Sequence, residues 1–428
     1  MNLLPYMEQW NMLPESGGVI LCAVSGGRDS MCLLDYLHHL GKTCGFTVAA
    51  AHLNHLMRPT AQRDVDFVRS FCEENGIPFY TEATPVYDRA KEWNITVEEA
   101  GRRARYEFLE CTADAIGAER IATAHHQNDQ AETVLLNLLR GTGPEGLGGI
   151  PPVRGRYIRP LLQTPRCEIE AYLATNRIDH IEDETNTSRA YARNRLRLDL
   201  WPALEELHGG ARENIVRCAN LVRQENAYLN ELAAQYLPET GTEISCEILQ
   251  KAPPVLQGRI LRQMMARLPS GKKDVGAVHV EALEKLCNEK GVLSLPGGMA
   301  AKCDGRTLCI FLADPLPEEL ALHAGENIWG DYLLTAEWES HAEITVRSWR
   351  PDDRLTLPGS RGARSVKRLF AERGIVSPER ERIPVVCVDG KVAAVFAVGQ
   401  DESFLNAKQI KMEINGDKSK EDKTDGKE

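Results

Sequence analysis

Six residues near the start of the chain have the types and the spacing of a phosphate-binding loop. The run S-G-G-R-D-S at Ser25–Ser30 follows an apolar stretch of strand length, Val19–Val24, and precedes apolar residues at helical spacing. Glycines bring a ligand close to the backbone, and the N–H groups at a helix start attract anions. Asp29 adds a carboxylate that can hold a metal ion against the phosphates. The candidate nucleotide-binding residues are Ser25, Gly26, Gly27, Arg28, Asp29 and Ser30.

A second run, H-H-Q-N-D-Q-A-E-T at His125–Thr133, could bind a cation. Asn128 or Asp129 can begin a helix that Gly141 ends, and Asp129 and Glu132 then lie one turn apart. A pair of carboxylates one turn apart suits a metal ion, an ammonium group or a protonated base. The alternative is helix capping, since an acid in the first turn interacts favourably with the helix dipole without any ligand.

Arginines gather in three further places. Arg105 lies in a predicted helix over 97–116, where it either faces inward or extends along the surface. Four arginines and no acid occur between Thr187 and Arg197, and ten basic against five acidic residues occur between Thr345 and Arg382. Basic patches on an acidic chain suit one specific polyanion, although solvated faces explain either patch equally well.

The elements that must position these residues alternate between strands and helices. Apolar runs predict strands at 19–24, 46–55, 79–82 and 120–124, separated by helices that include one after the S-G-G turn with Gly41 as its C-cap. Such alternation predicts a parallel sheet, whose ligands gather at the carboxyl ends of its strands. Ser25, His52, His55 and His125 all fall at such ends.

The rest of the chain changes pattern after His208. Long amphipathic helices and a small antiparallel sheet are predicted first, and short strands around an Arg-rich middle follow. The polar, charged C-terminus is expected to be disordered. We therefore predict an α/β Rossmann-like domain, a mostly helical domain, a small α+β domain and a tail, at 1–207, 208–316, 317–412 and 413–428.

Composition narrows the class of protein. The 428 residues carry a formal charge of −11, which argues against general nucleic-acid adhesion. The 12 cysteines include no C-x-x-C pair and are expected to be reduced thiols. No apolar run approaches the roughly 20 residues of a membrane span, and no signal segment opens the chain. We expect a cytoplasmic protein with no membrane partner.

Taken together, the motifs resemble the tRNA(Ile)-lysidine synthetase family of N-type ATP pyrophosphatases, also called the PP-loop superfamily. The S-G-G-x-D-S loop marks only the superfamily, whereas the run at His125–Thr133 with R-N-R at Arg193–Arg195 is far narrower. Further matches are H-L-N-H at His52–His55, A-R-Y-E-F-L at Ala104–Leu109, E-D-E-T-N at Glu182–Asn186 and, more weakly, W-R-P-D-D-R at Trp349–Arg354.

The resemblance implies that ATP and Mg²⁺ are used to replace the 2-oxo group of a cytidine by the ε-amino group of lysine. The cytidine is the wobble base of the CAU-anticodon tRNA(Ile), and the product shifts decoding from AUG to AUA. By resemblance, the loop holds the phosphates, with Asp29 near the metal or the reacting base. Asp129 and Glu132 clamp the lysine as a cation or take its proton, and His125 and Arg105 stabilise the adenylated intermediate. The tRNA would contact basic residues, namely Arg193, Arg195, Arg197, Arg350, Arg354, Lys367 and Arg368.

The motifs leave the roles of two residues and the choice between functions open. Asn128 stands where many family members have a second Asp, which moves the weight of any cation contact onto Asp129. Arg28 can touch pyrophosphate or face water.

The second candidate function is that of a PP-loop tRNA-thiolating enzyme, although paired cysteines are lacking. A regulatory nucleotide-binding module is left if the two acids are structural. The oligomeric state is open, with a homodimer as one option.

Overall fold

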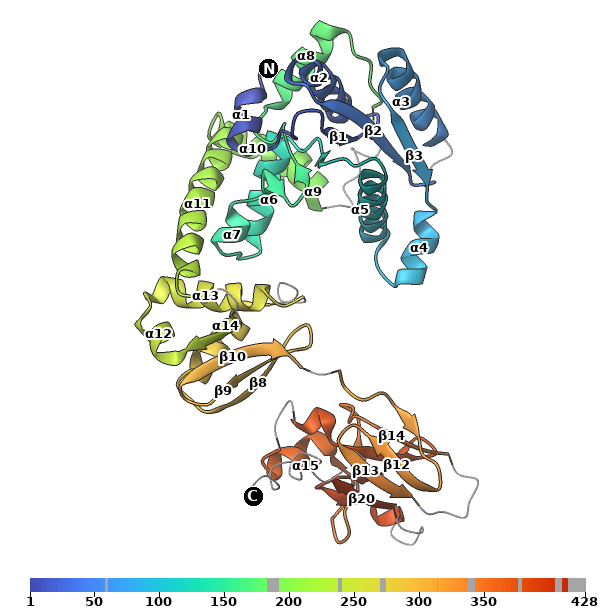
Figure 1. Cartoon of the computed structure of the whole chain (residues 1–428). Helices are drawn as coiled ribbons and strands as arrows, with labels where there is room; N and C mark the ends of the chain where they lie inside the picture. Colours follow the sequence, from blue (N-terminus) through green and yellow to red (C-terminus); the bar gives the residue numbers. More distant parts are fainter. Residues whose placement is uncertain are drawn as a thin grey trace, which may run out of the picture. The chain divides into compact units, whose positions relative to one another are not determined.

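The computed structural model forms two compact units, Met1–Ala227 and Tyr228–Glu428, which we describe separately (Figure 1). The described residues are 1–57, 61–182, 192–237, 241–269, 275–313, 315–336, 343–375, 379–404 and 410–414. Asp183–Asn186 of the E-D-E-T-N run and the predicted tail from Asn415 onward lie outside these residues.

The first unit is built on a mostly parallel sheet. Its strands are β1 (Val19–Ala23), β2 (Thr47–Asn54), β3 (Phe79–Ala83), β4 (Arg120–Ala122), β5 (Val153–Arg154) and β6 (Tyr157–Ile158). Their order is β3-β2-β1-β4-β6-β5, and only β5 runs antiparallel to its neighbour. Because β1 and β4 are adjacent and parallel, the segments that follow them emerge at the same edge.

Helices cover both faces of this sheet because its central strands are apolar on both sides. In β1, Ile20 and Cys22 pack in one buried cluster, whereas Leu21 packs in another. The first cluster includes residues of α2 (Arg28–Cys44), α3 (Ala61–Asn75) and α8 (Arg166–Asn176). The second includes residues of α5 (Val97–Ala115).

A further helical group brings a distant segment back to α6 (Gln127–Leu139). Ala131 of α6 packs with Leu196, Trp201 and Val216 in one buried cluster. This contact places the arginines of α9 (Ala192–Arg195) and the π-helical turn Leu196–Leu200 beside α6. The remaining helices of this group and the first unit are α1 (Leu4–Gln9), α4 (Val86–Trp93), α7 (Pro144–Leu147), α10 (Trp201–Leu207) and α11 (Ala211–Ala234).

The second unit begins at Tyr228 with the C-terminal end of α11, which short helices and an antiparallel sheet follow. The helices are α12 (Cys246–Lys251), α13 (Pro254–Ala266) and α14 (Ala277–Leu286). The sheet has the order β7-β10-β9-β8, with strands at Glu243–Ser245, Thr307–Leu312, Met299–Cys303 and Gly291–Leu295. Their apolar faces share one buried cluster that includes Ile260, Leu283 and Ile310.

The C-terminal part of the second unit is a set of small sheets with helix α15 (Val366–Glu372). The five-stranded sheet β11-β14-β17-β18-β19 has strands at Leu320–Ala321, Ile344–Arg347, Val385–Val388, Lys391–Val395 and Gly399–Gln400. The three-stranded sheet β12-β13-β20 spans Gly325–Trp329, Tyr332–Ala336 and Ile410–Ile414, and β15 (Arg354–Leu355) pairs with β16 (Arg364–Ser365).

The predicted fold class is confirmed, and two predicted helix boundaries are wrong. Helix α2 continues past Gly41 and ends at Gly45, whose φ is +79°. Gly41 is needed for packing, because a Cβ there would lie 2.5 Å from the Phe46 carbonyl oxygen. Helix α6 begins at Gln127 with His126 as its N-cap, ahead of the expected Asn128 or Asp129.

These elements leave the predicted division into domains at 207, 316 and 412 untested. The three-domain division stays a prediction, because compactness separates the chain only once, after Ala227. Among the described helices, none combines the length and the apolar character that crossing a bilayer requires.

Candidate active site

The loop between β1 and α2 is fixed by glycine geometry and by a contact with Ile181. Gly26 has a φ of +84°, a conformation that costs other residues strain. A Cβ at this position would also lie 3.0 Å from Cδ1 of Ile181. The Ile181 N–H donates a hydrogen bond to the Gly26 carbonyl at 2.9 Å. The S-G-G turn is therefore a constrained loop at the carboxyl end of β1.

The two serines of this loop differ in accessibility. Ser30 is buried, and its hydroxyl donates to the Gly27 carbonyl at 2.8 Å while accepting the N–H of Ser25 at 3.2 Å. Ser25 is exposed, and its hydroxyl accepts the N–H of Gly27 at 3.4 Å and lies 3.2 Å from the Ser30 hydroxyl. Arg28 forms an ion pair with Glu170 of α8, so its charge is matched within this part of the fold.

Asp29 lies in the first turn of α2 and directs one carboxylate oxygen toward α6. Its Oδ2 lies 3.7 Å from Nε2 of His126. Its Oδ1 is buried and has no hydrogen-bond partner within the described part of the chain. A buried carboxylate oxygen without a partner is costly unless something binds it. The Asp29 carboxylate therefore fits the role of a ligand to a cation.

The start of α6 is organised by a reciprocal cap. Nδ1 of His126 accepts the N–H of Asn128 at 3.3 Å, and Oδ2 of Asp129 accepts the N–H of His126 at 3.1 Å. The capping alternative for Asp129 is thus present in the structure. It leaves Oδ1 of Asp129 3.5 Å from Nη2 of Arg197.

Glu132 already has a cation of this chain beside it. Arg197 donates to both carboxylate oxygens of Glu132, at 2.8 and 3.0 Å, and the Glu132 side chain is 1% exposed. Arg193 lies 3.6 Å from the same carboxylate and donates to Oγ1 of Thr133 at 3.0 Å. The acid pair does accommodate cations, and in this structure they are guanidinium groups.

Burial and neighbouring charges push the pKa values of the two acids apart. Burial raises the pKa of Glu132 above its usual range, although the hydrogen bonds and charge of Arg197 oppose this effect. Burial also raises the pKa of Asp129, but His126, His125 and the His126 N–H outweigh it and leave that pKa below its usual range. Diverging pKa values in an acid pair indicate different chemical roles.

His125 is a neutral side chain at the same edge of the sheet. Burial lowers its pKa to about 4, against the opposing charge of Asp129. Its Nδ1 lies 3.0 Å from Oγ1 of Thr123, just after β4. His125 is therefore unprotonated at neutral pH and available to a ligand as a hydrogen-bonding group.

Arg105 belongs to a neighbouring part of this edge. Its Nη2 lies 3.3 Å from Nε2 of His55, the residue that follows β2. Burial, reinforced by the charge of Arg105, lowers the pKa of His55 to about 4. The structure thus brings Asp29, His126 and Asp129 together directly, and it joins Arg105 to His55.

Two family models match the chain. A model described as PP-loop domain covers residues 7–204, and one described as TilS substrate C-terminal domain covers residues 344–414. A protein named tRNA(Ile)-lysidine synthase from Caldanaerobacter subterraneus subsp. tengcongensis is 30% identical over 446 residues, which span 94% of both chains. The chain belongs to the tRNA(Ile)-lysidine synthase family.

Other relatives carry the same name. The Geobacter sulfurreducens protein is 32% identical over 86% of each chain. The Petrotoga mobilis protein is 36% identical over 65% of this chain and 88% of its own length. Membership in the tRNA(Ile)-lysidine synthase family confirms the predicted PP-loop fold and ATP use, and it does not favour the tRNA-thiolating alternative.

Two residues that the sequence left without a role have contacts or charges that act on the candidate site residues. His126 touches both Asp29 and Asp129, and its signal was its place three residues before an acid in an N-cap position. Arg159 is buried, donates to the Pro151 carbonyl at 2.7 Å, and its charge lowers the pKa of His125 after the larger effects of burial and Asp129. No spacing in the sequence indicated Arg159.

The predicted tRNA-contacting residues fall into two groups. Arg193 and Arg197 contact Glu132 as described, Arg350 pairs with Glu319 at 2.8 Å, and Arg368 pairs with Glu372 at 3.3 Å. Arg195, Arg354 and Lys367 are exposed, and no ion pair joins them to an acid within the described residues, whereas Arg193, Arg350 and Arg368 are exposed but paired. An exposed cation without an acidic partner keeps its charge available to a polyanion, so Arg195, Arg354 and Lys367 are the stronger candidates.

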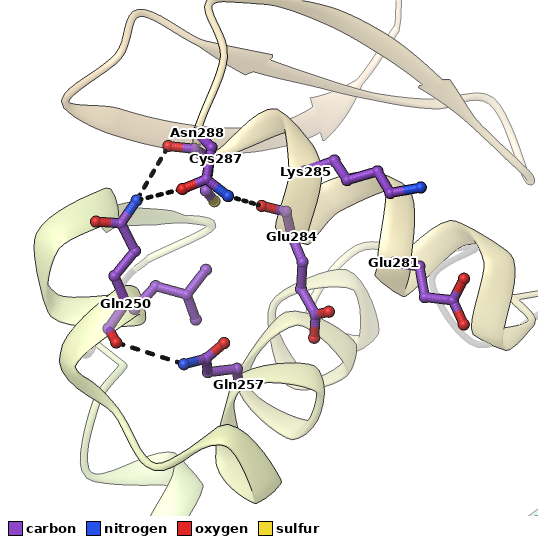
Figure 2. A pocket seen from close by; sticks show the side chains of 8 residues that line it. Gln250, Gln257, Glu281, Glu284, Lys285, Cys287 and Asn288 are labelled. Atoms are coloured by element: carbon purple, nitrogen blue, oxygen red, sulfur yellow. Dashed lines mark hydrogen bonds between the residues drawn. The ribbon is translucent and has the colours of Figure 1, made fainter.

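A pocket of about 490 Å³ lies between α12, α13 and α14 of the second unit (Figure 2). Its amides bond to one another and to the backbone. Gln250 donates to Oδ1 of Asn288 at 2.9 Å, and Gln257 donates to the Gln250 carbonyl at 3.4 Å. Satisfied amides leave few groups free to orient a substrate, so we do not place the active site here.

Proposed function

We propose that this chain joins L-lysine to C2 of the wobble cytidine in the CAU-anticodon tRNA(Ile), with ATP as the energy source. Its membership in the tRNA(Ile)-lysidine synthase family gives lysidine formation as the activity. The observation that carries the assignment of residues is the contact of Asp29, on the loop helix, with His126, which caps the acid-bearing helix α6. The product is read as AUA in place of AUG.

The first step is adenylation of the cytidine. The 2-oxo oxygen attacks the α-phosphate of ATP, the bond from that phosphorus to the β-phosphate oxygen breaks, and pyrophosphate leaves. We assign phosphate binding to the backbone of Gly26 and Gly27 and to the exposed hydroxyl of Ser25. Arg28 is kept as a candidate here, although its pairing with Glu170 reduces the charge it can offer.

Asp29 is the candidate ligand for Mg²⁺. Its buried Oδ1 has no partner within the described residues, which suits a hard cation. No group of three or more acids, histidines or cysteines fit for a metal occurs among the described residues. A single carboxylate is enough, since Mg²⁺ commonly takes its other ligands from phosphates and water. When bound, the ion offsets negative charge on the departing pyrophosphate.

The second step is attack of the lysine amine on C2, with AMP as the leaving group. We assign Asp129 to hold the substrate ammonium, because its low pKa keeps it ionised. Glu132, whose pKa burial raises, is the better acceptor for the proton that the amine must lose. For Glu132 to act in this way, the guanidinium of Arg197 must give up at least one of its two hydrogen bonds.

His125 and Arg105 are assigned to the adenylated intermediate. Neutral His125 can donate or accept a hydrogen bond at the cytidine, and the Arg105 guanidinium can face the negative α-phosphate.

We assign tRNA binding to the basic residues. Arg195, Arg354 and Lys367 are stronger candidates than the paired arginines. We also retain the division into a catalytic, a helical and a basic C-terminal domain.

The deciding experiment is incubation with ATP, lysine and an unmodified tRNA(Ile) transcript, followed by nucleoside mass spectrometry. We expect lysidine, formed together with AMP and pyrophosphate and dependent on both lysine and tRNA. A transcript with uridine at the wobble position is the matched control and should give no product. Formation of a thiolated nucleoside, or ATP cleavage that ignores lysine and tRNA, would contradict the proposal.

A further inference from the structure

Both ring nitrogens of His126 lie near polar groups, and the hydrogen bond at Nδ1 determines which nitrogen carries the proton. Nδ1 accepts the N–H of Asn128 at 3.3 Å, so Nδ1 carries no proton. In the neutral ring the proton is then on Nε2. The side chain is 4% exposed, so water has little access to it. His126 is therefore a fixed donor with a defined direction.

Nε2 of His126 lies at ion-pair distance from two carboxylates on two different elements. Nε2 lies 3.4 Å from Oδ2 of Asp129 on α6 and 3.7 Å from Oδ2 of Asp29 on α2. Two acids drawn toward one site repel each other unless a donor lies between them. Nε2 of His126 is within 3.7 Å of an oxygen of each acid.

The remaining oxygens show what this arrangement leaves available. Oδ2 of Asp129 also receives the backbone N–H of His126 at 3.1 Å, so the Asp129 carboxylate is fixed. Oδ1 of Asp29 has no partner in the described residues. His126 thus orients each carboxylate through Oδ2 and leaves the Oδ1 atom of Asp29 for a ligand.

We propose that His126 is a positioning residue that ties the ATP site to the lysine site by holding Asp29 and Asp129 at a fixed separation. The inference rests on the proposed function, which assigns Asp29 to the nucleotide and Asp129 to the amine. Capping alone does not account for His126, because a cap needs only the Nδ1 position, which shorter side chains supply. The Nε2 end adds a second function that no shorter cap offers.

Two substitutions separate these functions by atom position. His126→Asn places an amide oxygen near Nδ1, which preserves the cap, and removes the donor at Nε2. His126→Gln places an amide N–H near Nε2 and moves the cap acceptor away. His208→Asn, at an exposed histidine, is the matched control for the chemical change.

The measurements are the melting temperature, the apparent KM values for ATP and for lysine, and kcat with the tRNA substrate. We expect His126→Asn to keep the melting temperature while both KM values rise or kcat falls by about 10–100-fold, the usual effect of losing an orienting partner. We expect His126→Gln to melt earlier and to recover part of the lost activity. His208→Asn should match the unaltered protein.

The result that would overturn the inference is His126→Asn with unaltered KM values and kcat. Failure of His126→Gln to perform better than His126→Asn, with both folded, would also overturn it. Asp29→Ala and Asp129→Asn are measured in parallel. If these two keep full activity, the assignment of the two acids in the proposed function fails; if they lose activity while His126→Asn does not, only the positioning role fails.

Discussion

Two charge-rich regions of this chain use the same residue types in opposite ways. At the carboxyl edge of the first sheet, Asp29 keeps a buried oxygen without a partner in the described residues. In the W-R-P-D-D-R run, Asp353 accepts from Arg347 at 2.9 and 2.8 Å and from the N–H of Arg350 at 2.6 Å. An acid whose oxygens are all bonded stabilises a fold, whereas an acid with a free buried oxygen is prepared for a ligand.

The comparison also separates the arginines. Arg347 forms a buried ion pair with Asp353 in the C-terminal part, and both side chains are 8% exposed. Arg197 forms a similar pair with Glu132, but its own side chain is 27% exposed. A partly exposed partner can be displaced by a substrate cation at lower cost than a fully buried one. Partner accessibility therefore distinguishes a site from a structural ion pair better than residue type does.

The largest expected effect is on catalysis at the first region. Asp29→Ala should lower AMP formation by about 10³-fold or more, because it removes charge stabilisation of the departing pyrophosphate. AMP release is measured with saturating lysine and tRNA. Asp88→Ala, at an exposed acid of α4, is the control and should have no effect. If Asp29→Ala releases AMP at the unaltered rate, Asp29 is not a ligand-binding acid and the two regions do not differ in this respect.

The next effect is on stability at the second region. Asp353→Ala leaves Arg347 buried without its partner and should lower the free energy of unfolding of this part by about 3 kcal/mol. Denaturant unfolding measures the loss. Because Asp353 touches no proposed reactant, AMP formation with saturating lysine and tRNA should be unchanged. An Asp353→Ala protein with unaltered stability that no longer forms AMP would contradict the structural role of Asp353.

A smaller effect is expected on tRNA binding. Lys367→Ala and Arg354→Ala each remove an exposed cation, and each should reduce the slope of log Kd against log salt by about 1. Arg350→Ala should change the slope less, because its guanidinium is paired with Glu319 at 2.8 Å. Filter binding over a salt series gives the three slopes. Identical slopes for all three variants and the parent protein would remove this surface from the tRNA interface.

The smallest effect is a shift in one titration. Burial lowers the pKa of His125 to about 4, so its ring should stay neutral down to about pH 5 in a nitrogen-15 NMR titration. The contribution of this group to stability is full above its unfolded pKa of about 6.5 and is lost as the pH falls from there toward 4. His125→Gln identifies the signal. A ring that titrates near pH 6.5 would place His125 in water.

The sequence predicted the elements well where the apolar period was clear. The strands at 19–24, 46–55 and 120–124 were found because burial on both faces leaves near-continuous apolar runs. The end of α2 was missed because Gly41 looks like a cap, although a contact with Phe46 explains it. Local spacing does not reveal a reason that lies in another segment.

The candidate site was predicted residue by residue but not as an arrangement. The spacing placed Asp129 and Glu132 on one side of a helix, and the structure has them there. The return of Arg197 to Glu132, 65 residues away in the chain, depends on packing of Trp201 and Leu196 against Ala131. His126 lies near both Asp29 and Asp129 because β1 and β4 are adjacent in the sheet. No pattern in the sequence predicts which strands are adjacent.

The central claim is that Asp29 serves adenylation and Asp129 serves transfer of the lysine. The direct test follows pyrophosphate release and lysidine formation in the same reaction with Asp129→Asn, a variant that keeps the acceptor for the His126 N–H. We predict a burst of pyrophosphate of about one equivalent per bound tRNA with almost no lysidine, because adenylation precedes lysine transfer. Loss of the pyrophosphate burst, or lysidine at the unaltered rate, would contradict the account.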